Sequence, residues 1–181
     1  MQPRVKNCSE LAPLNNDALS TVRIVTCLNE RGRPEVVAAA MRMAIGDNHR
    51  VDNFHAGGIA AAVDLRSGEL GPASNLGMDA RLGWVERHPN SDATIRGRVV
   101  PRWKETCELA ERAHRAFDDR VIVGWDIAPT QDGPIIVEGN GSPDLDIVQR
   151  TTRSGLAGSR LSQLLSHHLQ RSPGVIPRPA S

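Results

Sequence analysis

The sequence has few cysteines and few aromatic residues, and both shortages limit what kind of protein it can encode. The three cysteines, Cys8, Cys27 and Cys107, are odd in number and widely spaced. This pattern fits neither a disulfide framework nor a zinc site, and it favours a reducing compartment, so we expect a cytoplasmic protein. Aromatic residues make up 3% of the chain and tyrosine is absent, so the core must be built from Val, Ile, Leu and Ala.

Long apolar runs and a strong net charge are also missing. No run approaches the roughly 18 residues of a membrane span, and the first residues lack the apolar segment of a secretory signal. The formal net charge of +1 gives no electrostatic reason to expect nucleic acid or an anionic membrane as a partner. A chain of 181 residues with 39% hydrophobic content is enough for one domain with its own core.

The stretch from 121 to 140 has the pattern of a β-hairpin. It reads Val-Ile-Val-Gly-Trp-Asp-Ile-Ala, then Pro-Thr-Gln-Asp-Gly, then Pro-Ile-Ile-Val-Glu-Gly-Asn, and two β-rich runs around turn residues are typical of paired strands. A turn centred near Asp132 places Asp126 opposite Glu138. Because side chains alternate along a strand, each run has a face made of every second residue. These two faces are Ile122, Gly124 and Asp126 on the first run, and Ile136, Glu138 and Asn140 on the second.

The acidic pair on this hairpin predicts a metal site. Two carboxylates opposed across a strand pair repel each other, and a cation between them would remove that repulsion. Asp126, Glu138 and the amide oxygen of Asn140 are hard oxygen ligands, which suit Mg²⁺ better than Zn²⁺. We therefore predict that these three residues bind magnesium. The alternative is a solvated strand face whose acidic residues keep a sheet edge soluble.

The same hairpin carries a resemblance to a known family. An Asp on one strand followed by Glu-x-Asn on the next resembles the metal-binding signature of the ATP-grasp superfamily. The segments Gly-Trp-Asp-Ile and Gly-Pro-Ile-Ile-Val-Glu-Gly-Asn are similar to its sugar-transfer-associated branch, which is found with polysaccharide biosynthesis functions. Ser-Thr-Val-Arg-Ile-Val-Thr from Ser20 and Val-Asp-Asn-Phe-His-Ala-Gly-Gly-Ile from Val51 match as well. The resemblance runs from about Leu19 to Gln149 and covers the C-terminal catalytic portion of the family.

This resemblance implies a site for ATP and Mg²⁺. Arg23 and Arg42 would be the catalytic residues, because a planar guanidinium suits phosphate oxygens; either could instead be a strand residue that extends to solvent. The segment around Gly57 and Gly58 is not a phosphate loop of the Gly-Lys-Ser or Gly-Lys-Thr type. Its glycines would let backbone amides approach a phosphate, and the alternative is a plain turn into a strand. The implied nucleotide-binding residues are Arg23, Arg42, Asn53, Gly57, Gly58, Asp126 and Glu138.

The predicted fold is α/β (α+β) and ATP-grasp-like, with a mainly antiparallel sheet and flanking helices. Propensity alone would make the Ala- and Met-rich segment after Pro34 a helix, whereas the resemblance implies a strand there. We expect a long helix after Pro101, a short one through Gln149, and no regular structure between Ala73 and Gly97. The expected strands are Thr21–Leu28, Glu35–Ile45, Ile59–Leu65, Glu69–Pro72, Val121–Ala128 and Pro134–Gly139.

The chain divides into an N-terminal segment over residues 1–18, an ATP-grasp-like domain over 19–170 and a disordered tail over 171–181. Within the domain, a last helix is expected from Ser154 to Gln170. His114 is expected on the surface of the helix after Pro101 rather than in a catalytic site.

The resemblance implies ATP-dependent ligation, in which a carboxylate is activated as an acyl phosphate and attacked by an amine or similar nucleophile. The expected substrate is a small-molecule carboxylate, with sugar-linked acids among the candidates. Family members carry a further N-terminal portion that supplies part of the adenine cleft. We therefore expect weak nucleotide binding from this chain alone, with that portion or a partner chain completing the cleft. Two alternatives stay open: a non-catalytic module that keeps a metal or anion site, and a carboxylate-metal phosphohydrolase.

Overall fold

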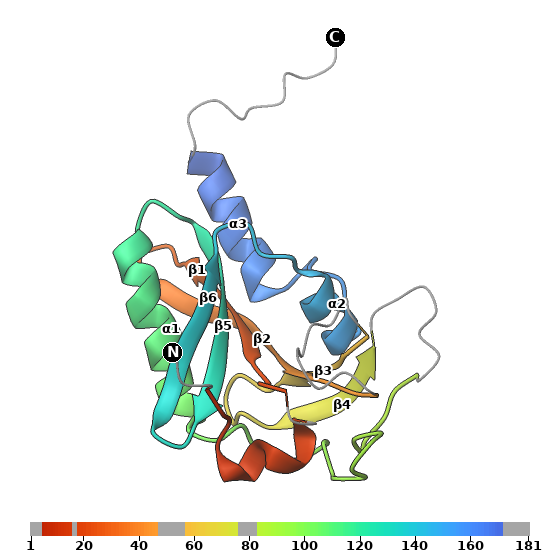
Figure 1. Cartoon of the computed structure of the whole chain (residues 1–181). Helices are drawn as coiled ribbons and strands as arrows, with labels where there is room; N and C mark the ends of the chain where they lie inside the picture. The colour runs from red at the N-terminus through yellow and green to blue at the C-terminus, as the bar shows by residue number, and fades with distance from the viewer. Residues whose placement is uncertain (1–4, 16–17, 47–56, 76–82, 172–181) are drawn as a thin grey trace.

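One antiparallel sheet forms the centre of the molecule. The computed structural model describes residues 5–15, 18–46, 57–75 and 83–171. Within these ranges six strands pair in the order β4-β3-β2-β1-β5-β6, and helices lie on both faces of the sheet (Figure 1). This confirms the predicted α+β fold. The strands are β1 Val22–Leu28, β2 Pro34–Met43, β3 Ile59–Val63, β4 Leu70–Asn75, β5 Ile122–Thr130 and β6 Gly133–Asn140.

The Ala- and Met-rich segment is a strand, β2, as the resemblance implied. It pairs with β1 on one side and β3 on the other, and both of its faces are covered. Ala38 and Ala40 contact one helical layer, and Ala39 and Met41 contact the other. A central position with two hydrogen-bonded neighbours outweighs the weak helix propensity of these residues.

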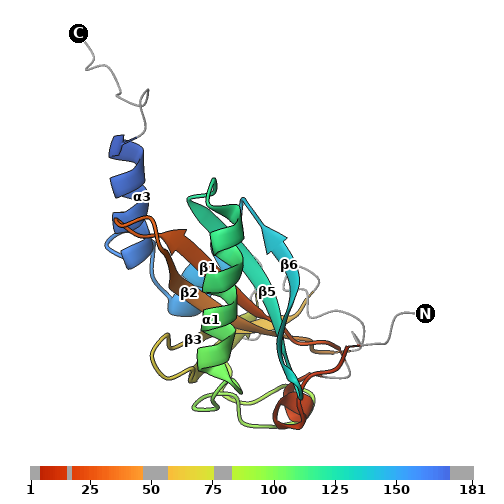
Figure 2. The same cartoon turned by 90° about the vertical axis from the view of Figure 1, so that its left-hand side faces the viewer.

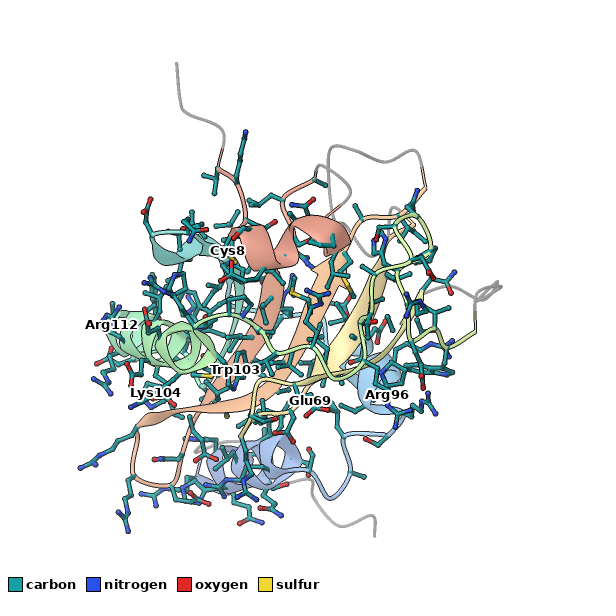
Figure 3. The ribbon with its side chains drawn as sticks, turned by 90° about the horizontal axis from the view of Figure 1, so that it is seen from below. Cys8, Glu69, Arg96, Trp103, Lys104 and Arg112 are labelled. Atoms are coloured by element: carbon teal, nitrogen blue, oxygen red, sulfur yellow. The ribbon has the colours of Figure 1, made fainter. Side chains whose placement is uncertain are left out.

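The helices form one layer on each face of the sheet. Helix α1 (Trp103–His114) packs on one face together with a short 3-10 helix, Ser9–Leu14. Helices α2 (Asp146–Thr152) and α3 (Arg160–Arg171) pack on the other, and Figure 2 shows the sheet from the α1 side. Trp103 lies between α1 and the sheet (Figure 3). None of the helices in the described ranges has the length and apolar character needed to cross a membrane.

Three expectations about local structure are wrong. Helix α3 begins at Arg160 rather than Ser154, because Gly158 has φ +80 and interrupts any helix across that segment. The described part of the stretch between Ala73 and Gly97 is not without pairing, since it forms bridges such as that between Ala73 and Val85. His114 is fully buried rather than on the surface. The predicted tail, apart from the last residue of α3, lies outside the described residues.

Gly68 is required in the turn before β4 for two separate reasons. Its φ is +77, and a Cβ at this position would lie 2.6 Å from Cγ of Trp103. Gly32 has a similar φ of +69, but nothing lies within 4 Å of its added Cβ. An alanine at position 32 would therefore meet backbone strain alone, whereas an alanine at position 68 would meet both backbone strain and a steric clash.

We predict that Gly32→Ala lowers the free energy of unfolding by about 1 kcal/mol, the usual cost of a left-handed conformation. Gly68→Ala should lower it by about 3 kcal/mol, because the indole must also move. Urea denaturation followed by circular dichroism measures both values. Equal losses in the two variants would show that the contact with Trp103 does not matter.

Candidate functional site

Charged side chains from three neighbouring strands lie in one row across the sheet. In the register, Arg23 of β1 pairs with Asp126 of β5, and Asp126 pairs with Glu138 of β6. Cross-strand partners share a face, and this is the face that carries Val25 and the helices α2 and α3. The structure therefore brings together three of the residues that the sequence proposed for nucleotide and metal.

Two arginines share the carboxylate of Asp126. Arg23 donates from Nε to Oδ1 at 2.6 Å and from Nη2 to Oδ2 at 3.2 Å, and Nη2 of Arg42 lies 3.0 Å from Oδ2. The side chain of Asp126 is 6% exposed and each arginine 13%. Charges this far from water need partners and strong hydrogen bonds. The carboxylate of Asp126 is thus a countercharge that both guanidiniums share.

Thr21 holds the second arginine in place. Its Oγ1 accepts hydrogen bonds from Nε of Arg42 at 3.0 Å and from Nη2 at 2.6 Å, and its backbone carbonyl accepts from the Arg42 N–H at 2.9 Å. Thr21 belongs to a segment that matches the family, but no role was predicted for it. The signal was its position two residues before Arg23, because side chains two residues apart in an extended chain lie on the same side.

A β-bulge sets the position of Glu138. Asp126 pairs with Glu138, whereas Ile127 pairs with Ile136, so Val137 is an extra residue on β6. The bulge reverses the alternation of faces. Ile136 therefore lies on the face opposite to Glu138, and the expectation that they share a face is wrong. Without the bulge, the tight turn of this hairpin would point Glu138 away from Asp126.

Asn140 lies on the same face as Glu138, one step further along the edge strand. It pairs with Gly124, and its Oδ1 accepts a hydrogen bond from the Ser142 N–H at 2.9 Å. A Cβ on Gly124 would lie 2.6 Å from Cβ of Pro143, so the missing side chain lets this loop cross β5. Glu138 and Asn140 are both exposed. No three His, Cys, Asp or Glu side chains gather as metal ligands in the described part of the chain.

The glycine segment lies at the start of β3. Gly57 is exposed with φ +95, and Gly58 is buried directly before Ile59. The strand that follows pairs with β2, where Arg42 faces Ala60. Asn53, the remaining candidate, lies outside the described residues. The roles of these three residues stay predictions.

A buried polar network fixes β1 against β5 from the opposite face. Oγ1 of Thr26 accepts a hydrogen bond from Nε1 of Trp125 at 2.8 Å and donates to the Val123 carbonyl at 3.2 Å. Nδ1 of His114 lies 2.8 Å from the same hydroxyl, and Nε2 lies 2.9 Å from the Arg120 carbonyl. His114 is thus a support for the sheet, and the pairing that it supports places Arg23 beside Asp126.

We predict that Asp126→Asn lowers the free energy of unfolding by about 2 kcal/mol. The amide keeps the shape and one acceptor oxygen, but it removes the negative charge that two largely buried guanidiniums share. Glu138→Gln is the matched control, because an exposed side chain should change stability by no more than about 0.5 kcal/mol. Urea unfolding of the two variants checks this, and similar values for both would contradict a structural role for the cluster.

The comparisons with known proteins agree with this geometry. The model of a family described as sugar-transfer associated ATP-grasp matches residues 1–164, which extends beyond the resemblance at both ends and confirms it. No curated protein matches the chain. The family model covers most of the 181 residues. The chain therefore belongs to the sugar-transfer associated ATP-grasp family.

Proposed function

We propose that this chain binds ATP together with Mg²⁺ and serves an ATP-dependent carboxylate ligation linked to polysaccharide biosynthesis. Membership of the ATP-grasp family supports ATP-dependent, ligase-type activity related to sugar transfer. The observation that carries the proposal for this chain is the cluster of Arg23, Arg42 and Asp126 beside Glu138. The substrate that we propose is a small carboxylic acid, with a sugar-linked acid as the first candidate.

Arg23 and Arg42 are suited to bind the phosphates of ATP. Each presents a planar fork of donors that matches a phosphate group. Both contact one carboxylate, so they lie close together on one sheet face before any ligand arrives. Phosphoryl transfer depends mainly on positioning and on charge stabilisation. Two arginines on a sheet face would supply both without a nucleophilic side chain.

The three predicted metal ligands have the right chemistry for Mg²⁺. Asp126, Glu138 and Asn140 offer only oxygen atoms, and two of them carry negative charge. Bound there, Mg²⁺ would neutralise part of the phosphate charge. Both oxygens of Asp126 accept from arginines in this structure. Asp126 would become available to the metal when Arg23 and Arg42 turn from it to the phosphates.

This exchange of partners makes nucleotide and metal depend on each other. Without phosphate, the arginines keep Asp126 from the metal. Without metal, the negative charge of Asp126 holds the arginines away from the phosphates. ATP and Mg²⁺ together satisfy both sets of groups, so we expect the pair to bind better than either alone.

A non-catalytic anion-binding module is the second candidate. It is favoured by the fact that Asp126 already has two cationic partners, while Glu138 and Asn140 lie on an exposed edge strand. ATP binding that is independent of Mg²⁺ would support this alternative over a ligase. We also propose a cytoplasmic location, which the free thiols of Cys8, Cys27 and Cys107 support.

We predict that Arg23→Ala weakens ATP binding about tenfold or more in the presence of Mg²⁺, since one charge-assisted contact with phosphate is lost. Adenosine binding should change by less than about twofold, because adenosine carries no phosphate. Calorimetric titration of the full chain measures both. Arg66→Ala, in the exposed turn before β4, is the matched control and should bind ATP normally. Equal loss for ATP and adenosine would mean that the substitution disturbed the fold instead.

A further inference from the structure

A second concentration of positive charge lies at the opposite edge of the sheet, around Trp84. The guanidinium carbon of Arg153 lies 3.9 Å from the centre of the indole ring, and that of Arg150 lies 5.3 Å from it. Both arginines come from the C-terminal end of α2. Cation–π contact holds them there, and no carboxylate in the described residues forms an ion pair with either.

Arg150 has an unused donor. Its Nη2 donates to Oγ of Ser74 on β4 at 3.1 Å, but its Nε is buried without a hydrogen-bond partner among the described residues. Asp146 precedes it by one helical turn, which is the usual position for a carboxylate that pairs with an arginine. Asp146 is exposed and forms no ion pair with it in the described residues. The arginine turns towards the sheet instead.

Arg153 is held in an uncommon backbone conformation. Its φ is +55 and its ψ is +27 at the end of α2, a left-handed conformation that residues other than glycine rarely adopt. The side chain is exposed at this position. A helix often ends with one residue in this conformation, usually a glycine, and here that residue is an arginine that forms no ion pair among the described residues.

Trp84 and Arg153 border a hollow of about 470 Å³ at the β4 edge. The volume suits a small organic ligand. Glu86 and Arg96 in its wall pair with each other, so among the described lining residues Arg153 is the charged side chain without an ion pair. Arg96 is seen at this edge, beside α2, in Figure 3. The lining residues with polar side chains are Trp84, Glu86, Arg96, Thr151, Thr152 and Arg153.

We propose that this hollow binds an acidic saccharide, with its carboxylate on Arg153 and its hydroxyls on Glu86, Arg96 and Thr152. An anion would supply the missing countercharge, and a planar guanidinium suits a carboxylate. The wall mixes donors and acceptors, which suits hydroxyl groups better than a simple anion. A neutral sugar would bring no countercharge to Arg153.

The hollow is distinct from the proposed nucleotide site. Its lining includes Ala62 on β3. Ala62 pairs with Ala40 on β2, and Ala40 pairs with Arg23 on β1. Helix α2 packs over β2, β3 and β4 and covers Ala40. Two strand spacings, or about 10 Å, separate β3 from β1, and Arg42 on the strand between them directs its guanidinium to Asp126 on β5. A saccharide in the hollow would thus be held apart from the phosphates.

The test is an NMR titration of the full chain without nucleotide or Mg²⁺, following the indole N–H of Trp84. Trp84→Phe assigns this signal, because it removes one of the three indole resonances. The probes are glucuronate, glucose, acetate and inorganic phosphate. We expect glucuronate to shift the signal at a concentration at least tenfold below that needed for glucose or acetate. Failure of ATP binding would leave this result untouched, so the two proposals fail separately.

Two arginine variants test where the carboxylate of glucuronate binds. Arg153→Gln should weaken glucuronate binding about fivefold or more, while Arg87→Gln, on the same loop as Trp84 and paired with Asp92, should leave it unchanged. The proposal is overturned if glucuronate gives no shift, if acetate or phosphate binds as well as glucuronate, or if Arg153→Gln binds glucuronate normally.

Discussion

The carboxylate of Asp126 is the group on which the rest of the site depends. It is almost inaccessible to solvent and balances two arginines from neighbouring strands. A buried charge without a partner is costly. Separating the three side chains would therefore destabilise the central strands that carry them. The same requirement gives the protein a functional property. Two guanidiniums are held side by side on one sheet face.

The rest of the fold sets the geometry of this cluster. The polar contacts of Thr26 with Trp125 and His114 fix β1 against β5 on the reverse face. Small residues at Ala38, Ala40 and Ala60 let α2 and α3 pack onto the site face. The bulge at Val137 turns Glu138 to the side of Asp126. The charged row therefore results from packing on both faces and from one irregularity at the edge.

Much of this could be predicted from residue patterns and family resemblance. Alternation along the hairpin pointed to Asp126 and Glu138 as neighbours, and the resemblance gave β2 its strand. The bulge could not be predicted, because one additional residue leaves no mark in the composition, and it reversed the face of Ile136. The burial of His114 was missed because its partners, Thr26 and the Arg120 carbonyl, come from other segments. The pairing of Arg23 with Asp126 was missed because each had been assigned only to a ligand.

The most direct test of this account is the ATP affinity of Asp126→Asn, measured by calorimetry with Mg²⁺ and again with EDTA at a temperature where the variant is folded. If Asp126 pairs with the arginines in the free protein and with the metal in the complex, the substitution should change the ATP affinity in opposite directions under the two conditions. In EDTA the variant should bind ATP more tightly than the unmodified chain, because a negative charge that attracts both arginines and repels the phosphates is gone. With Mg²⁺ it should bind more weakly, because a metal ligand is lost. A change in the same direction under both conditions would contradict the account.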